Sequence, residues 1–281
     1  MRYLQGITTI PATEPDNPLI LGQAVHTGIE KSLEEAIREY CFRFPIITDE
    51  HINEIIKFET VIPLARAAIP PGGKFEVEIK DDDFHGFIDY LVPATVFERG
   101  VELPDTYDLY DFKYSNNVSG YKQSGQLHEY KYFFERNNPG KRIRNMYFVF
   151  IPKVTIRQKK TETLLEFRER LKEALSGVEV KIVQIEFNPE KVIEFLFGIK
   201  AVNEETEFPQ EKSHLCRYCE FQEYCEKGND YMIKLPENKR RNIEAVEKRV
   251  LWIYGVPFCG KTTFANNFPD PLMLNTDGNI K

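Results

Sequence analysis

The sequence contains no apolar run that approaches the roughly 18 residues needed for a membrane-crossing helix. Its first residues, Met1 to Pro11, lack the basic start and long apolar stretch of a secretory signal. We therefore expect a cytoplasmic protein. It has five cysteines, an odd number, and three of them stand at positions 216, 219 and 225. In the cytoplasm, such a cluster favours a metal site over disulfides.

An overall excess of positive charge is also missing, because the net charge is −7. The charge is unevenly distributed, however. Residues 113–172 contain 14 Lys and Arg against 5 Asp and Glu, a net charge of +9, so the rest of the chain carries −16. A basic stretch inside an acidic protein can bind phosphates, although an ordinary solvated surface explains the same count.

The 281 residues suffice for one large domain or two small ones. Hydrophobic periodicity predicts the following order of elements, with turn signals between them: helices at Gly22–Tyr40 and Asp49–Ala68; strands at Phe75–Lys80, His85–Val92 and Tyr107–Tyr114; a helix at Lys122–Arg136; a strand at Arg142–Ile151; a helix at Thr161–Leu175; a strand at Val178–Phe187; and a helix at Pro189–Val202. This order predicts an α/β or α+β fold with a central sheet flanked by helices.

Acid-x-Lys tripeptides occur at least five times, beginning at Glu78, Asp111, Glu129, Glu179 and Glu237, so most of them must be chance. Asp111-Phe-Lys113 differs because it ends a predicted strand, which places Asp111 and Lys113 on one face. The preceding strand carries Asp89 among apolar residues, where an acid is costly unless it is paired or binds a metal. Carboxylates that hold Mg²⁺ beside a lysine are what phosphodiester hydrolysis needs. The alternative is a structural salt bridge between Asp89 and Lys113.

Four segments resemble, in order, the motifs of RecB-like PD-(D/E)xK nucleases: Gly22-Gln-Ala-Val-His26-Thr-Gly-Ile-Glu30, Gly86-Phe-Ile-Asp89, Asp111-Phe-Lys113 and Gln126-Leu-His-Glu-Tyr130. These nucleases include phage exonucleases and the CRISPR-associated and AddB-type enzymes, and the resemblance covers roughly residues 20–226. It implies that His26, Asp89 and Asp111 bind a catalytic Mg²⁺ or Mn²⁺ and that Lys113 assists the attacking water. It also implies that Gln126 and Tyr130, four residues apart on one helix face, line the site near DNA. Either Glu76 or Glu78 adds a further shell.

Residues 214–225 contain Cys-x2-Cys-x5-Cys, formed by Cys216, Cys219 and Cys225. The first spacing is typical of metal ligands. The segment resembles the C-terminal cluster of the iron–sulfur branch of the same family, which takes its fourth cysteine from upstream of the helix histidine. Here the upstream cysteine is Cys41, which follows His26 instead. Cys41 would complete a [4Fe–4S] cluster, and His214 would instead complete a zinc site.

An apolar strand beginning at Val250 runs into Gly255-x4-Gly260-Lys261-Thr262, the P-loop pattern. Its backbone N–H groups cradle phosphates, while the lysine and threonine reach the β/γ-phosphates and Mg²⁺. The tail resembles the start of a phage-type P-loop ATPase, but it is too short to bury a doubly wound core. We therefore expect a nuclease domain with its cysteine cluster over residues 1–230, a linker over 231–249 and a truncated, vestigial nucleotide-binding segment over 250–281.

These features predict a metal-dependent deoxyribonuclease, acting from DNA ends in phage recombination or replication. On this view it works in the cytoplasm of a bacterial host, with a P-loop ATPase or a single-strand-binding protein as candidate partners. One rival is a nucleotide-binding protein whose nuclease-like part only holds DNA. Another is a non-enzymatic adaptor organised around the cysteines. A Mg²⁺-dependent digestion of linear DNA with and without ATP discriminates among them.

Overall fold

In the computed structural model, the residues described are 14–82, 84–98, 101–103, 105–206, 212, 216 and 221–227. The chain divides into two compact units, residues 1–222 and 223–281. The first unit is built on a five-stranded mixed sheet with the order β1-β2-β5-β6-β7. Its strands are β1 (Lys74–Lys80), β2 (His85–Pro93), β5 (Thr106–Tyr114), β6 (Arg142–Ile151) and β7 (Lys181–Ile185).

The central pair of strands, β5 and β6, is parallel, and the other three pairs are antiparallel. Two short helices and turns separate β5 from β6, namely α5 (Val118–Lys122) and α6 (Gln126–Asn137). A parallel pair needs such a crossover, since a tight turn can join only antiparallel strands. A separate two-stranded sheet, β3 (Val96–Glu98) with β4 (Val101–Leu103), lies between β2 and β5 in sequence.

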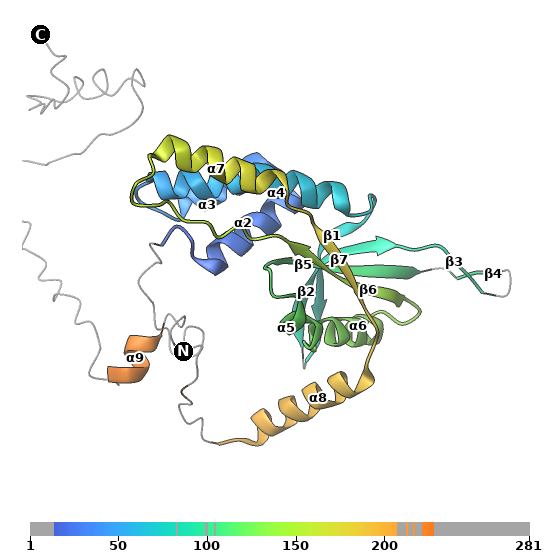
Figure 1. The fold of residues 1–281 in the computed structure, drawn as a ribbon. Coiled ribbons are helices and arrows are strands. Elements are labelled where there is room, and N and C mark those ends of the chain that lie inside the picture. Colours follow the sequence, from blue (N-terminus) through green and yellow to red (C-terminus); the bar gives the residue numbers. More distant parts are fainter. Residues whose placement is uncertain are drawn as a thin grey trace, which may run out of the picture. The chain divides into compact units, whose positions relative to one another are not determined.

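Helices cover both faces of the sheet (Figure 1). One apolar cluster joins the even-numbered side chains of β5, such as Tyr110 and Phe112, to helices α2 (Pro18–Glu30), α3 (Leu33–Phe42), α4 (Asp49–Ala68) and α7 (Leu164–Ser176). A second cluster joins Leu109 and the opposite face to α6 and α8 (Pro189–Glu204). The sheet is therefore buried on both sides, as expected when strands carry apolar residues on both faces.

The predicted elements are confirmed in type and order, with two differences. The helix expected at Gly22–Tyr40 is broken into α2 and α3, because the Ser32 hydroxyl accepts a hydrogen bond from the Glu35 N–H at 3.2 Å and starts a new helix. The helix expected at Lys122–Arg136 begins at Gln126 instead, with Gly125 as the N-cap of α6, and α5 ends at Lys122. The sequence did not predict β3 and β4. Within the described part of the chain, no helix has the length and apolarity to cross a membrane.

Candidate active site

The candidate site lies where β2 and β5 stop pairing. Their register runs from Pro93 opposite Tyr107 to Tyr90 opposite Tyr110 and goes no further along either strand. Asp89 and Asp111 are the next residues on the two strands. Beyond the last pair, the backbone groups of β5 that would have bonded β2 need other partners, since buried N–H and C=O groups are almost always paired.

At Phe112, the side chains of Asp89 and His26 replace β2 as the partners of the backbone N–H and C=O groups. The Phe112 N–H donates to Asp89 Oδ2 at 2.7 Å, and the Phe112 carbonyl oxygen lies 2.9 Å from His26 Nε2. One residue's N–H and C=O face the same neighbouring strand, so a single peptide segment of β5 orients both side chains. Phe112 itself is buried among the helices on the α2 face and holds this segment in place.

The contact with Phe112 also sets the tautomer of His26. A carbonyl oxygen can only accept, so Nε2 carries the hydrogen and Nδ1 is left with its lone pair. Nδ1 lies 3.6 Å from Asp89 Oδ1. Burial is the main cause that lowers the pKa of His26, which keeps the imidazole neutral and able to bind a metal. A metal-binding histidine is typically held this way, through its other ring nitrogen.

A kink in β1 brings a third ligand group to the same place. Glu76 has φ +49°, a left-handed conformation that is unusual for a residue other than glycine. In the β1–β2 register it falls between the pairs Phe75–Tyr90 and Val77–Ile88, opposite Asp89. Ligand atoms of His26, Glu76 and Asp89 all lie within 4.8 Å of one another. Strained backbone of this kind tends to occur at functional sites.

Asp111 lies beside this group of three and faces Lys113. Its Oδ2 is 2.6 Å from Lys113 Nζ, and the side chain is 1% exposed. Neither carboxylate oxygen accepts a hydrogen bond of regular geometry among the described residues. The lysine is held further by two aromatic rings, with Nζ 5.3 Å from the ring centre of Tyr121 and 5.7 Å from that of Phe148. The structural ion pair of Lys113 is therefore with Asp111.

The surroundings of Asp89 and Asp111 disfavour the charged form of each side chain. Burial raises the pKa of Asp89 to about 7. Burial, reinforced by repulsion from Asp89, raises the pKa of Asp111 to about 7 as well. Ionising both of these buried, neighbouring carboxylates has a high free-energy cost unless a cation binds between them. The donor set of one imidazole nitrogen and carboxylate oxygens suits Mg²⁺ or Mn²⁺.

We predict that a divalent cation stabilises the protein most at high pH. The folded-state pKa values of Asp89 and Asp111 lie above the unfolded value, so the stability of the metal-free protein falls as pH rises from about 4 through about 7. Thermal unfolding with and without Mg²⁺ measures this, and the shift in melting temperature should be larger at about pH 8 than at about pH 5.5. An equal shift at both values would contradict a metal held by these two groups.

Gln126 and Tyr130 lie together on α6. The amide Nε2 of Gln126 donates to the Tyr130 hydroxyl at 3.0 Å. Burial is the main cause that raises the pKa of Tyr130 to about 12, and the nearby charges of Asp111 and Asp89 add to it. Gly86 makes room for it, because a Cβ there would come within 2.9 Å of Phe84 and 3.2 Å of Tyr130.

The sequence did not identify the roles of two residues at the site, Glu76 and Phe112. Glu76 and Glu78 share one face by simple alternation, so no pattern separates them; only the left-handed φ of Glu76 does. Glu78 instead contacts His85, with Oε1 3.0 Å from Nε2 on an exposed surface. Phe112 acts through its peptide groups, and an apolar side chain gives no sign of that role.

The cysteine and P-loop predictions fall largely outside the described residues. Cys219, His214 and the P-loop residues Gly255, Gly260, Lys261 and Thr262 are not described. Cys216 belongs to the first compact unit and Cys225, on α9 (Gln222–Lys227), to the second. Cys41 lies on α3, packed against the apolar core, and burial raises the pKa of its thiol.

Comparisons with known proteins bear on both parts of the chain. A crystal structure of a candidate exonuclease from Eubacterium rectale is similar, with 12% identity, a TM-score of 0.40 and coverage of 76% of this chain and 83% of that one. No curated protein matches. A family model described as an AAA domain matches residues 247–281. The model of the PD-(D/E)XK nuclease superfamily matches residues 1–226, and the chain therefore belongs to that superfamily.

Proposed function

We propose that this protein is a metal-dependent DNA nuclease whose site comprises His26, Glu76, Asp89, Asp111 and Lys113. The observation that carries the proposal is the convergence of three ligand side chains, from a helix and two strands, within 4.8 Å of one another. They lie beside an aspartate–lysine pair on a third strand. Membership of a nuclease superfamily supports the same reaction class.

The residues present fit a divalent cation. His26 offers Nδ1, Glu76 and Asp89 offer carboxylate oxygens, and Asp111 has two buried oxygens without a regular hydrogen bond. A bound Mg²⁺ or Mn²⁺ would supply charge stabilisation for the phosphodiester and an acidified water. The Phe112 peptide segment preorganises Asp89 and His26 before any ion arrives.

Each remaining side chain has a distinct role in the proposal. Lys113, held by Asp111 and two rings, orients the attacking water and offsets negative charge as it develops on the phosphate. The hydroxyl of Tyr130, fixed by Gln126, borders the site where a DNA strand would approach. In this role Gln126 and Tyr130 position the substrate and take no part in proton transfer.

The finer assignments follow the same resemblance. We propose that cleavage starts from DNA ends, serves phage recombination or replication in the cytoplasm of a bacterial host, and requires no ATP. The 247–281 segment, which matches an AAA domain, is then not required for cleavage. We further propose that Cys216, Cys219 and Cys225 hold a metal centre that fastens the C-terminal segment. The centre is either a [4Fe–4S] cluster with Cys41 as its fourth ligand or a zinc ion with His214 as its fourth ligand. The visible spectrum and metal content separate these two forms.

The test is a digestion of end-labelled and internally labelled linear DNA, single- and double-stranded, with Mg²⁺, with Mn²⁺ and with a chelator, each with and without ATP. We expect short products released progressively from ends, only when metal is present and equally without ATP. Cleavage of closed circular DNA at the same rate would reject the exonuclease mode. Cleavage in chelator would reject the metal-dependent mechanism.

A further inference from the structure

The segment between β6 and α7, residues 152–163, is fixed next to the end of β5. The Ser115 N–H donates to the Ile151 carbonyl at 3.2 Å, two residues past Lys113. The Asn116 side chain then pairs with the Lys153 backbone in both directions, Nδ2 to the carbonyl at 2.8 Å and the Lys153 N–H to Oδ1 at 3.0 Å. The segment thus leaves the sheet at the end where Lys113 lies.

Apolar side chains then fasten this segment to the core. Val154 and Ile156 pack against the apolar cluster on the α2 face. Thr155 and Arg157, which alternate with them, are exposed, as are Lys159 and Lys160 further on. No ion pair joins any of these three cations to a carboxylate among the residues that the structure describes.

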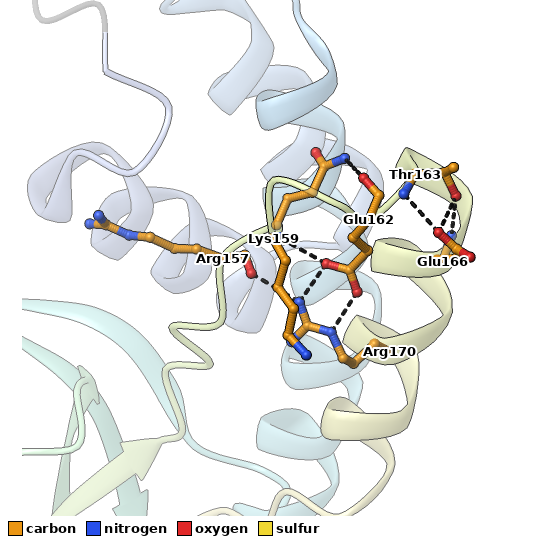
Figure 2. A network of polar contacts seen from close by, with 7 residues as sticks. Arg157, Lys159, Glu162, Thr163, Glu166 and Arg170 are labelled. Atoms are coloured by element: carbon orange, nitrogen blue, oxygen red, sulfur yellow. Dashed lines mark hydrogen bonds and ion pairs between the residues drawn. The ribbon is translucent and has the colours of Figure 1, made fainter.

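The one acid of the segment, Glu162, is occupied internally (Figure 2). Arg170 of α7 binds it in a bidentate pair, Nε to Oε1 at 2.7 Å and Nη2 to Oε2 at 2.8 Å. The same Nη2 donates to the Arg157 carbonyl at 2.9 Å, and the Lys159 N–H donates to Glu162 Oε2 at 3.0 Å. These contacts hold the backbone of the basic residues, while the Arg157 side chain extends away from the ion pair (Figure 2).

In this segment the negative charge is therefore paired with Arg170, while the positive charges are exposed to solvent. Hydrogen bonds from Arg170 are the main cause that lowers the pKa of Glu162 to about 2, so this carboxylate stays charged and turned toward Arg170. Because the backbone of these cations is already fixed, binding an anion has to order only their side chains and not the chain that carries them. A flexible loop with solvated lysines does not need the hydrogen bonds that fix this backbone through Glu162 and Arg170.

We propose that residues 152–163 form a preorganised arm that binds the phosphates of the DNA strand leading to the site, through Arg157 and Lys159. This inference rests on the proposed nuclease function. Arg157 is six positions after Ile151, so the arm reaches at most about 20 Å from the strand end. The contacts are to the backbone of the nucleic acid, and they give affinity without sequence preference.

The experiment measures binding of a labelled single-stranded oligonucleotide to the full chain by fluorescence anisotropy, across a range of salt concentrations. All proteins carry Asp111→Asn, so that the labelled oligonucleotide is not cleaved during the measurement. Arg157→Gln/Lys159→Gln should weaken binding roughly tenfold at about 0.1 M salt and lower the salt slope by about 1.4, or about 0.7 for each lost phosphate contact. An unchanged affinity and slope would overturn the proposal.

The matched control is Lys141→Gln/Arg142→Gln, which removes one lysine and one arginine at the opposite end of β6. It should leave affinity within about twofold; an equal loss in both double variants would mean that only net charge matters and would reject the arm. The charge-preserving swap Arg157→Lys/Lys159→Arg should retain affinity, and a loss there as large as in the glutamine variant would also reject it. Arm-dependent affinity in the Asp111→Asn background, together with no cleavage by the chain that keeps Asp111 in the digestion assay, would refute the nuclease function and keep this inference.

Discussion

Asp111→Asn should reduce DNA cleavage by about a thousandfold or more, since the metal-assisted reaction depends on this carboxylate for several kcal/mol of barrier lowering. The substitution preserves the shape of the side chain but removes the negative charge that faces Lys113 Nζ at 2.6 Å. Single-turnover cleavage of labelled DNA with saturating Mg²⁺ measures the effect. DNA affinity should change little, because the loss falls on the chemical step.

The same variant should be more stable than the parent in the absence of metal. Asp111 is 1% exposed, and its charged form is disfavoured by burial and by Asp89. Removing that charge relieves a cost that grows in the parent from about pH 4 and is complete above about pH 7. A variant that is inactive and also unfolds at a lower temperature at about pH 8 would indicate a structural role for Asp111 instead.

Glu76→Gln should weaken Mn²⁺ binding by at least about tenfold, while Glu78→Gln should leave it unchanged. The two glutamates are two residues apart on β1, and the substitutions change net charge equally, so each is the control for the other. Glu76 lies in the ligand group with His26 and Asp89, whereas Glu78 contacts His85 on the exposed surface. An exposed contact of that kind contributes about 0–1 kcal/mol at most.

Calorimetric titration with Mn²⁺ measures both variants without any cleavage. Equal losses in the two would show that β1 contributes only a general negative potential near the site. A loss confined to Glu78→Gln would mean that the kink at Glu76 does not exist in solution, and the β1–β2 register would have to be shifted by two positions, which brings Glu78 opposite Asp89.

The strands that carry the site could be predicted from sequence because their signals are local. Alternating and continuous apolar residues marked the strands that became β2, β5 and β6, and β6 has the predicted bounds, Arg142–Ile151. The same periodicity put Asp111 and Lys113 on one face, where they lie. The helix break at Ser32 and the start of α6 after Gly125 were missed, since a cap within a long periodic pattern is decided by tertiary packing as much as by propensity.

The assembly of the ligands depends on features that no residue pattern encodes. β2 separates from β5 beyond Tyr90, and β1 kinks at Glu76, so side chains from α2, β1 and β2 meet at one gap. Sequence left open whether Glu76 or Glu78 adds a further shell, and the structure brings Glu76 within reach of His26 and Asp89. Asp111, expected among the ligands, lies beside Lys113. Peptide groups such as those of Phe112 are identical in every sequence, which is why their role was invisible.

The most direct measurement of the central claim is an anomalous difference map from a crystal of the full chain grown with Mn²⁺. We expect one strong peak bounded by His26 Nδ1 and carboxylate oxygens of Glu76 and Asp89, with a carboxylate oxygen of Asp111 completing the protein ligands. His26 should keep its Nε2 contact to the Phe112 carbonyl. A peak that His26 and Asp89 do not share, or Mn²⁺ bound elsewhere with this gap empty, would contradict the account.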